Sequence, residues 1–252
     1  MSTRIGSYLA SFLLVTAAPL AAQWLNYPTP DIPRTPDGKP NLTAPAPRFT
    51  DGKPDLSGLW QADDNPYVRD LQKPALTPEG EAIAKQSVRR ASLCLPPGLA
   101  DLQASPFKIH HSSTGTIVIL YEYNYFRQIF LDSRPLPKEP NPTWLGYSIG
   151  RWDGDTLVVD IGGFNNQVEI IGGRLGAARL GPLPHSEELH VTERYHRRDF
   201  GHMEIEFAIE DAKVYTKPWS FKEDLQLLPD TELLEYICEE NEKDLEHRIG
   251  RQ

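Results

Sequence analysis

Polar and apolar residues alternate with a period of two between Glu188 and Glu210, and this alternation predicts one β-hairpin. A loop at Asp199-Phe200-Gly201 would join its strands, with Gly201 in the left-handed conformation that such loops need. Pairing Arg198 with His202 then places complementary polar side chains opposite each other on one face. These pairs are His196 with Glu204, Arg194 with Glu206, and His190 with Glu210. A slip of one residue would turn every side chain over, so the pattern predicts a single register.

The same alternation predicts further strands along the chain. Two more hairpins are expected, at 116–122 with 126–132 and at 145–152 with 155–161. The second would turn at Asp153-Gly154, a dipeptide typical of type I′ turns. Later strands are predicted at 215–228 and 232–238. Sequential strands with almost no helix between them indicate an antiparallel barrel or sandwich.

One short helix is predicted, at Pro78–Arg90. Thr77 can serve as its N-cap, Pro78 suits the first helical position, and Glu79 suits the first turn. The fold class expected is therefore mainly β, with a single helix.

Residues 23–55 are predicted to form an extended, proline-rich arm in front of a barrel domain at 56–252. The stretch 24–57 holds eight of the 23 prolines and has little apolar periodicity. It also contains a short repeat, because Arg34–Thr43 and Arg48–Ser57 share an Asp-Gly-Lys-Pro turn. We expect the arm to run over the surface of the domain.

Composition narrows the functional classes. The 252 residues are 39% apolar and carry a formal net charge of −9, which argues against nucleic acid or an anionic membrane surface as partner. Residues 1–22 have the pattern of a signal peptide, with Arg4 before a short apolar stretch and small residues before Gln23. The stretch is too short to span a bilayer, although a retained N-terminal anchor is an alternative. The mature protein is predicted to be periplasmic or secreted, without a membrane span.

The two cysteines, Cys94 and Cys238, lie far apart in the sequence. In an oxidising compartment they could form a disulfide, and two separate buried thiols are the alternative. Their spacing does not match a zinc motif.

Two resemblances bear on the fold. Gly58-Leu59-Trp60 resembles the start of the first strand in lipocalins, where a Gly-x-Trp motif lies at the closed end of the barrel. The likeness implies a lipocalin-like antiparallel barrel with Trp60 near one end. Longer segments are similar to a family of uncharacterised exported bacterial proteins, which implies export and one β domain but transfers no catalytic residue. These segments are 51–60, 127–132, 146–160, 184–194 and 215–219.

Three carboxylates are candidates for chemistry: Glu122, Asp160 and Glu193. Each falls on the mostly apolar face of a separate predicted hairpin. A buried carboxylate must be paired, protonated or facing a cavity, because burying an unpaired charge is costly. If the three faces line one barrel interior, the carboxylates could act there as general acids or bases. Alternatively each is held in a salt bridge by an arginine, with Arg127, Arg151 and Arg194 as available partners.

Five residues are candidates for binding a ligand near those carboxylates. Gln128 shares a face with Glu122, and Tyr147 is predicted to pair with Asp160. Arg127 is a charged neighbour, His185 lies in a loop that could reach a barrel mouth, and Tyr123 could stack on a ring.

No metal or other cofactor is predicted. A site formed by His185, His202 and a carboxylate is conceivable, but no short ligand spacing supports it. Phosphate-binding and dinucleotide-binding glycine loops are absent from the sequence.

Three functions remain open at this point. The first is an exported barrel that binds a small, largely apolar or aromatic molecule. The second is a hydrolase, lyase or isomerase that uses carboxylate acid–base chemistry in the barrel. The third is an envelope interaction protein that uses the arm and the acidic surface. The sequence leaves the oligomeric state open.

Overall fold

The structure, a computed structural model, describes residues 28–63, 68–87, 95–171, 180 and 183–237. The predicted signal peptide lies outside this part of the chain. So do Cys94 and Cys238, and their predicted disulfide stays a prediction.

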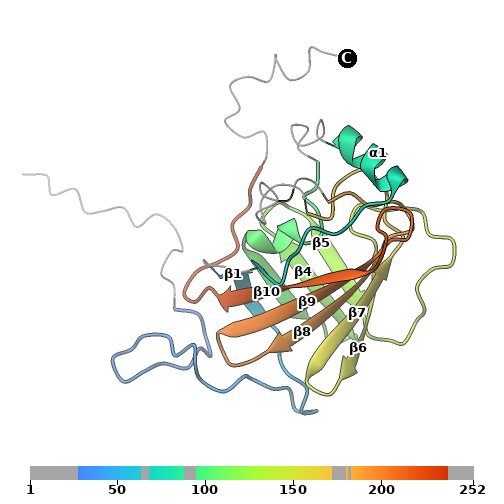
Figure 1. Cartoon of the computed structure of the whole chain (residues 1–252). Helices are drawn as coiled ribbons and strands as arrows, with labels where there is room; N and C mark the ends of the chain where they lie inside the picture. The colour runs from blue at the N-terminus through green and yellow to red at the C-terminus, as the bar shows by residue number, and fades with distance from the viewer. Residues whose placement is uncertain (1–27, 64–67, 88–94, 172–179, 181–182, 238–252) are drawn as a thin grey trace, which may run out of the picture.

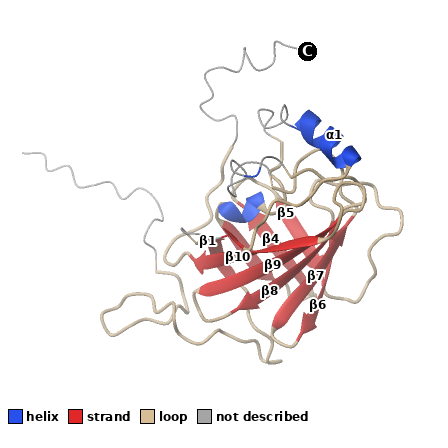
Figure 2. Ribbon diagram, in the orientation of Figure 1, coloured by secondary structure: helices blue, strands red, loops and turns tan. Residues whose placement is uncertain are grey.

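The described residues form a closed β-barrel, as the sequence predicts (Figures 1 and 2). Nine strands follow one another around the barrel in chain order, and β1 pairs with β10 to close it. The short strand β2 (Val68–Arg69) adds a second partner to β10 beyond the end of β1. The barrel strands are β1 (Gly58–Ala62), β3 (Phe107–His111), β4 (Thr116–Tyr121), β5 (Phe126–Phe130), β6 (Tyr147–Asp153), β7 (Thr156–Gly162), β8 (His190–Arg197), β9 (His202–Glu210) and β10 (Trp219–Leu227).

All neighbouring strands in the barrel are antiparallel except β5 and β6. A ring with an odd number of strands cannot alternate direction all the way round, so one neighbouring pair must run the same way. That pair is joined through only two residue pairs, Ile129 with Ser148 and Phe130 with Ile149. The wall of the barrel is therefore weakest between β5 and β6.

The β8–β9 hairpin has the predicted register, with Glu193 opposite Phe207 and His196 opposite Glu204. The predicted role of Gly201 is wrong, because its φ is not in the left-handed range. Gly201 is instead needed for close packing against the arm. A Cβ atom there would lie 2.4 Å from Cβ of Leu42.

The β6–β7 hairpin is shifted by two residues from its predicted register. Tyr147 pairs with Gly162, and Asp160 pairs with Ile149, so the predicted Tyr147–Asp160 pair is wrong. The two-residue loop is Gly154-Asp155, in which Gly154 has a φ of 60°. A positive φ at the first loop residue is typical of type II′ turns. A shift of two residues leaves every side chain on its original face.

Trp60 is fully buried and lies, as predicted, near one end of the barrel, the end that the arm covers and that we call the closed end. Its indole Nε1 donates to the carbonyl of Leu56 at 3.0 Å, and the guanidinium of Arg197 lies 4.8 Å from its ring centre. Arg197 also donates to the carbonyls of Asp55 and Ser57 in the arm and of Asp199 and Phe200 in the β8–β9 turn. Burial lowers the pKa of Arg197 to about 10. The arginine thus binds the arm to the barrel end.

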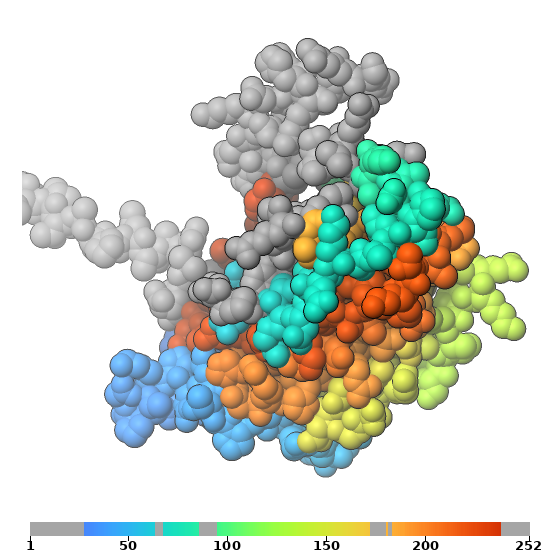
Figure 3. All heavy atoms as spheres, in the orientation of Figure 1, coloured from blue at the N-terminus to red at the C-terminus, as the bar shows by residue number. Residues whose placement is uncertain are grey.

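The two repeats of the arm fold in the same way and bind two parts of the barrel. Arg34 donates to the carbonyl of Gly38 in its own turn and pairs with Asp230 after β10. Arg48 donates to the carbonyl of Gly52 and pairs with Asp155 in the β6–β7 turn. The arm therefore follows one end of the barrel, as the space-filling view shows in blue (Figure 3).

The helix α1 (Pro78–Ser87) begins as predicted, with Oγ1 of Thr77 accepting the backbone N–H of Gly80 at 3.0 Å. Residues 88–90 of the predicted helix lie outside the described residues. A 3₁₀ helix, η1 (Asp101–Ala104), packs against β1 at the other end of the barrel (Figure 2). Among the described residues, no helix has the length and apolar character to cross a membrane.

The predicted strand at 232–238 is wrong for its described part, because residues 231–237 contain no strand. The barrel is already closed by β1 and β10, so no strand edge is left for it. The segment lies instead against the β4–β5 turn, where the backbone N–H of Tyr236 donates to the carbonyl of Glu122 and its ring meets Tyr123.

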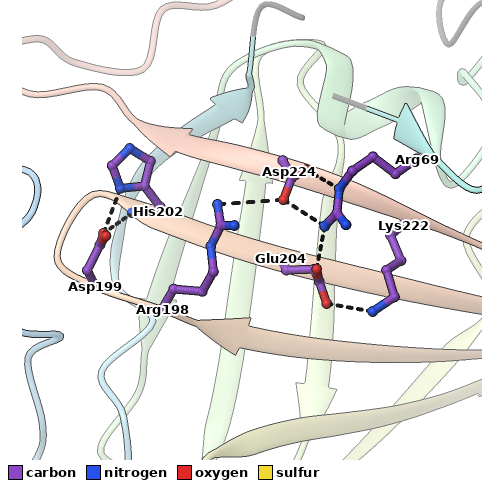
Figure 4. A network of polar contacts seen from close by, with 7 residues as sticks. All are labelled: Arg69, Arg198, Asp199, His202, Glu204, Lys222 and Asp224. Carbon is purple, nitrogen blue, oxygen red and sulfur yellow. Dashed lines mark hydrogen bonds and ion pairs between the residues drawn. The ribbon is translucent and has the colours of Figure 1, made fainter. Parts of the chain in front are cut away.

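An ionic network holds β2 on the outside of the barrel (Figure 4). The guanidinium of Arg69 donates to Asp224 on β10 and to Glu204 on β9. Lys222 donates to the other oxygen of Glu204 at 2.9 Å, and Arg198 pairs with Asp224 at 3.6 Å. Two residues of strand alone would hold β2 weakly, and these contacts add to its attachment.

Candidate functional site

A buried ion pair lies inside the barrel. Both terminal nitrogens of Arg127 on β5 donate to Glu193 on β8, one to each carboxylate oxygen at 2.9 Å. The side chains are 2% and 0% exposed. The hydroxyl of Tyr195 donates to Oε2 of Glu193 at 2.9 Å, and Arg127 also donates to Oγ of Ser148 at 3.2 Å.

The charges of this pair support each other. Burial alone would lower the pKa of Arg127, but the charge and hydrogen bonds of Glu193, together with nearby Tyr121 and Tyr195, outweigh burial and hold that pKa well above its ordinary value. Burial, together with the charge of Glu193, raises the pKa of Tyr195 far above its ordinary value, so its hydroxyl remains a donor. Glu193 thus accepts three hydrogen bonds and is fixed in place.

In the β4–β5 hairpin the predicted inner face, which carries Glu122 and Gln128, is wrong. The opposite face points into the barrel. Arg127 and Ile129 face the interior, whereas Gln128 and Phe126 are exposed. Both faces of this hairpin are rich in apolar residues, so the alternation alone could not select the inner one. The buried partner Glu193, three strands away around the barrel, makes the Arg127 face the inner one.

Besides Nε of Arg127, two polar groups inside the barrel have no hydrogen-bond partner among the described residues. They are the hydroxyl of Tyr121 on β4 and both carboxylate oxygens of Glu223 on β10. Burial raises the pKa of Tyr121 to about 12. Burial also raises the pKa of Glu223 well above its ordinary value, and the charges of Asp101 and Glu193 add to this effect.

A groove of about 360 Å³ opens where β5 and β6 separate. Arg127 and Ser148, which hold Glu193 on the inside, also line the groove. Gln128 provides an exposed polar group, and Thr143 has a buried hydroxyl oxygen without a partner among the described residues. Most of the other lining residues are aromatic: Tyr125, Phe126, Phe130, Trp144 and Tyr147.

A second hollow, of about 310 Å³, lies at the closed end of the barrel between the arm and the strands. Asp31 of the arm, Arg197 of β8 and Leu227 of β10 are among its lining residues. Its polar groups are largely engaged in holding the arm, as the hydrogen bonds of Arg197 show.

The structure does not bring the three predicted catalytic carboxylates together. Only Glu193 lies in the interior. Asp160 is on the outer face, where Arg151 donates to it at 2.5 Å and Thr192 at 3.1 Å. Glu122 lies half-buried in the β4–β5 turn. The expectation of one shared internal pocket fails because two of the three apolar faces point outward.

The predicted ligand-binding residues divide between separate places. Arg127, Gln128 and Tyr147 line the groove between β5 and β6. Tyr123 packs against Tyr236 with ring centres 4.9 Å apart. His185 is buried near Phe164, and burial lowers its pKa.

The conceivable metal site at His185 and His202 is not formed. His202 lies at the start of β9, with Nδ1 2.7 Å from Asp199. His185 precedes Ser186, which binds Asp211 just beyond the other end of β9. Eight residues of strand separate these ends by roughly 26 Å. Within the described part of the chain, no group of three His, Cys, Asp or Glu side chains converges as metal ligands would.

Glu223 is not among the carboxylates predicted from the sequence, although its signal was present. Trp219, Phe221, Leu225 and Leu227 alternate with polar residues along β10, and Glu223 falls on their apolar face. It is the same pattern that marked Glu193. The groove had no comparable signal, because it arises from the parallel pairing of β5 with β6.

The chain matches no family model, no curated protein and no solved structure.

Proposed function

We propose that this protein is an exported binding protein for a small, largely apolar or aromatic molecule. Its ligand would lie in the groove between β5 and β6. The observation that carries this proposal is the aromatic lining of the groove between β5 and β6, the two strands of the barrel joined by the fewest residue pairs. The predicted export signal at residues 1–22 supports a periplasmic or secreted location.

The size and composition of the groove suit such a ligand. Small-molecule sites have volumes of roughly 300–1,000 Å³ and combine apolar walls with a few polar groups. Phe126 is 63% exposed beside the groove, so its ring is available to contact a ligand there. Gln128 could orient a polar substituent, and the hydroxyl of Tyr147, which already donates to the carbonyl of Asn141 at 2.9 Å, could accept a hydrogen bond from one.

The buried ion pair would keep the groove in shape. Arg127 and Ser148 come from the two strands that separate there, and their hydrogen bond links those strands across the gap. Because Arg127 is held by two bonds to Glu193, the inner wall of the groove is fixed before a ligand arrives.

The enzyme alternative has less support. A general base needs a free lone pair near its substrate, and Glu193 already accepts from Arg127 and Tyr195. Asp160 is engaged with Arg151 on the outer face. The envelope interaction alternative would use the arm, whose two arginines are already engaged with the barrel.

Titration with the fluorescent aromatic probe 1-anilinonaphthalene-8-sulfonate tests the proposal. Phe126→Ala should weaken binding by roughly tenfold or more, since burying an aromatic ring contributes about 1.5–3 kcal/mol. Leu120→Ala is the matched control, because Leu120 is an exposed apolar residue on the same hairpin face and does not line the groove. If both variants bind the probe as the wild type does, the groove is not the site.

A further inference from the structure

The inner face of β10 places a carboxylate beside aromatic rings. Phe221 and Glu223 are two residues apart on one strand, and both are fully buried. Phe221 stacks on Phe207 of β9, with ring centres 4.7 Å apart and planes within 2°. Trp219 also stacks on Phe221, with ring centres 5.7 Å apart. Phe221 and Glu223 therefore share the inner face of β10, with Phe207 packed against Phe221.

Glu223 has no counter-charge within the described part of the barrel. Neither of its oxygens has a hydrogen-bond partner there. The cation inside the barrel, Arg127, is already neutralised through two hydrogen bonds to Glu193. Asp101 of η1 and Glu193 of β8 are near enough to act on Glu223, and both add negative charge. A carboxylate in these surroundings is stable only with a proton or with a cation.

A carboxylate beside apolar rings suits an organic ammonium ion. The stacked rings of Phe207 and Phe221 supply apolar surface for its carbon chain. A carboxylate beside the ring adds charge and hydrogen-bond acceptors. A metal ion fits less well, because no group of three suitable ligands converges among the described residues.

We propose that the barrel interior beside Glu223 and Phe221 is a second binding site, which takes an organic ammonium ion. This site is separate from the groove between β5 and β6, and the inference does not depend on the groove being occupied. The ammonium group would lie against the carboxylate of Glu223, and its carbon chain would lie against the stacked rings of Phe207 and Phe221. The hydroxyl of Tyr121 is a further polar group without a partner among the described residues.

Binding of this ligand should be coupled to loss of a proton. Burial and the charges of Asp101 and Glu193 raise the pKa of Glu223 and so favour its protonated form. An arriving ammonium ion reverses that preference, so Glu223 releases its proton to solvent. The affinity should therefore rise with pH across the range in which the ammonium group itself stays charged.

Isothermal titration calorimetry with n-butylammonium tests the proposal, with 1-butanol as the uncharged ligand of similar size. The full chain should bind n-butylammonium at least tenfold more tightly than 1-butanol. Titrations in two buffers of different ionisation enthalpy should show proton release on binding. No uptake of n-butylammonium, equal affinity for 1-butanol, or uptake without proton release would each overturn the site.

Two variants locate the site. Glu223→Gln should weaken n-butylammonium binding at least tenfold and abolish the proton release, while circular dichroism shows a folded barrel. If that variant does not fold, the proton release of the wild type still decides the question. Phe126→Ala should bind n-butylammonium as the wild type does, since Phe126 is on the outer face. A loss of binding in Phe126→Ala would place the amine in the groove and overturn the interior site.

Discussion

At the scale of single residues, two buried carboxylates of the same type meet different surroundings. Glu193 accepts hydrogen bonds from Arg127 and Tyr195 and forms an ion pair with Arg127. Glu223 has no such donors among the described residues, and its pKa is raised by burial. The surroundings of each carboxylate, and not its residue type, therefore decide whether it is held in an ion pair or has a raised pKa.

Glu193→Gln should lower the free energy of unfolding by about 3 kcal/mol or more, because Arg127 would stay buried without its counter-charge. The matched control is Asp160→Asn, which removes a carboxylate from the neighbouring strand. Asp160 is paired with a largely exposed Arg151, so that change should cost less than about 1 kcal/mol. Urea denaturation of both variants provides the comparison. Equal losses of unfolding free energy in the two variants would contradict the conclusion that the buried pair of Arg127 and Glu193 stabilises the fold more than the outer pair does.

The raised pKa of Glu223 makes a prediction about pH. The folded protein holds this proton at pH values where the unfolded chain has lost it. The contribution of Glu223 to stability should therefore be full below the unfolded pKa and decline as the pH rises toward the folded pKa. Glu223→Gln, measured by urea denaturation across pH, should remove this decline. The same pH slope in the variant and the wild type would show that Glu223 is ionised in the fold.

Glu204 should give the opposite slope and serves as a comparison. Burial acts to raise the pKa of Glu204, but its hydrogen bonds with Lys222 and Arg69 outweigh burial and lower it. Its stabilising contribution is present above the unfolded pKa and is lost as the pH falls through the folded pKa. Glu204→Gln should therefore reduce the loss of stability in acid.

At the scale of elements, the sequence predicted a hairpin well where several signals agreed. In β8–β9 the two faces and the turn all require one register, and that register is observed. In β6–β7 the turn dipeptide alone set the register, and it was wrong by two residues. In β4–β5 the strand pairing followed from the pattern, but both faces were apolar and the inner face could not be chosen. The groove could not be foreseen, because the pairing of β5 with β6 depends on how the whole barrel closes.

Contact between the arm and the barrel can be tested at Gly201. Gly201→Ala should lower the melting temperature and speed proteolysis of the arm, because the added Cβ would collide with Leu42. Gly162→Ala is the control, since its Cβ would meet only Leu136, at an ordinary contact distance of 3.5 Å. Limited proteolysis followed by mass spectrometry reports on the arm directly. Unchanged cleavage of the arm in Gly201→Ala would show that this contact does not hold it.

At the scale of the whole molecule, the arm covers one end of the barrel, and the barrel wall has its fewest paired residues between β5 and β6. Trp60, Arg197 and the arm occupy the closed end. The pairing of β5 with β6 leaves an aromatic groove in the wall, backed by the buried pair of Arg127 and Glu193. We therefore expect ligands to approach from the side of the barrel and not through its closed end.

The most direct test of this account is to map the probe on the protein by nuclear magnetic resonance. In ¹H–¹⁵N spectra of the full chain titrated with 1-anilinonaphthalene-8-sulfonate, amides of residues 124–130 and 143–148 should shift together and saturate with one affinity. Amides around the closed-end hollow, such as Asp31 and Leu227, should stay in place. Shifts concentrated at the closed end, with none between β5 and β6, would contradict the proposed site.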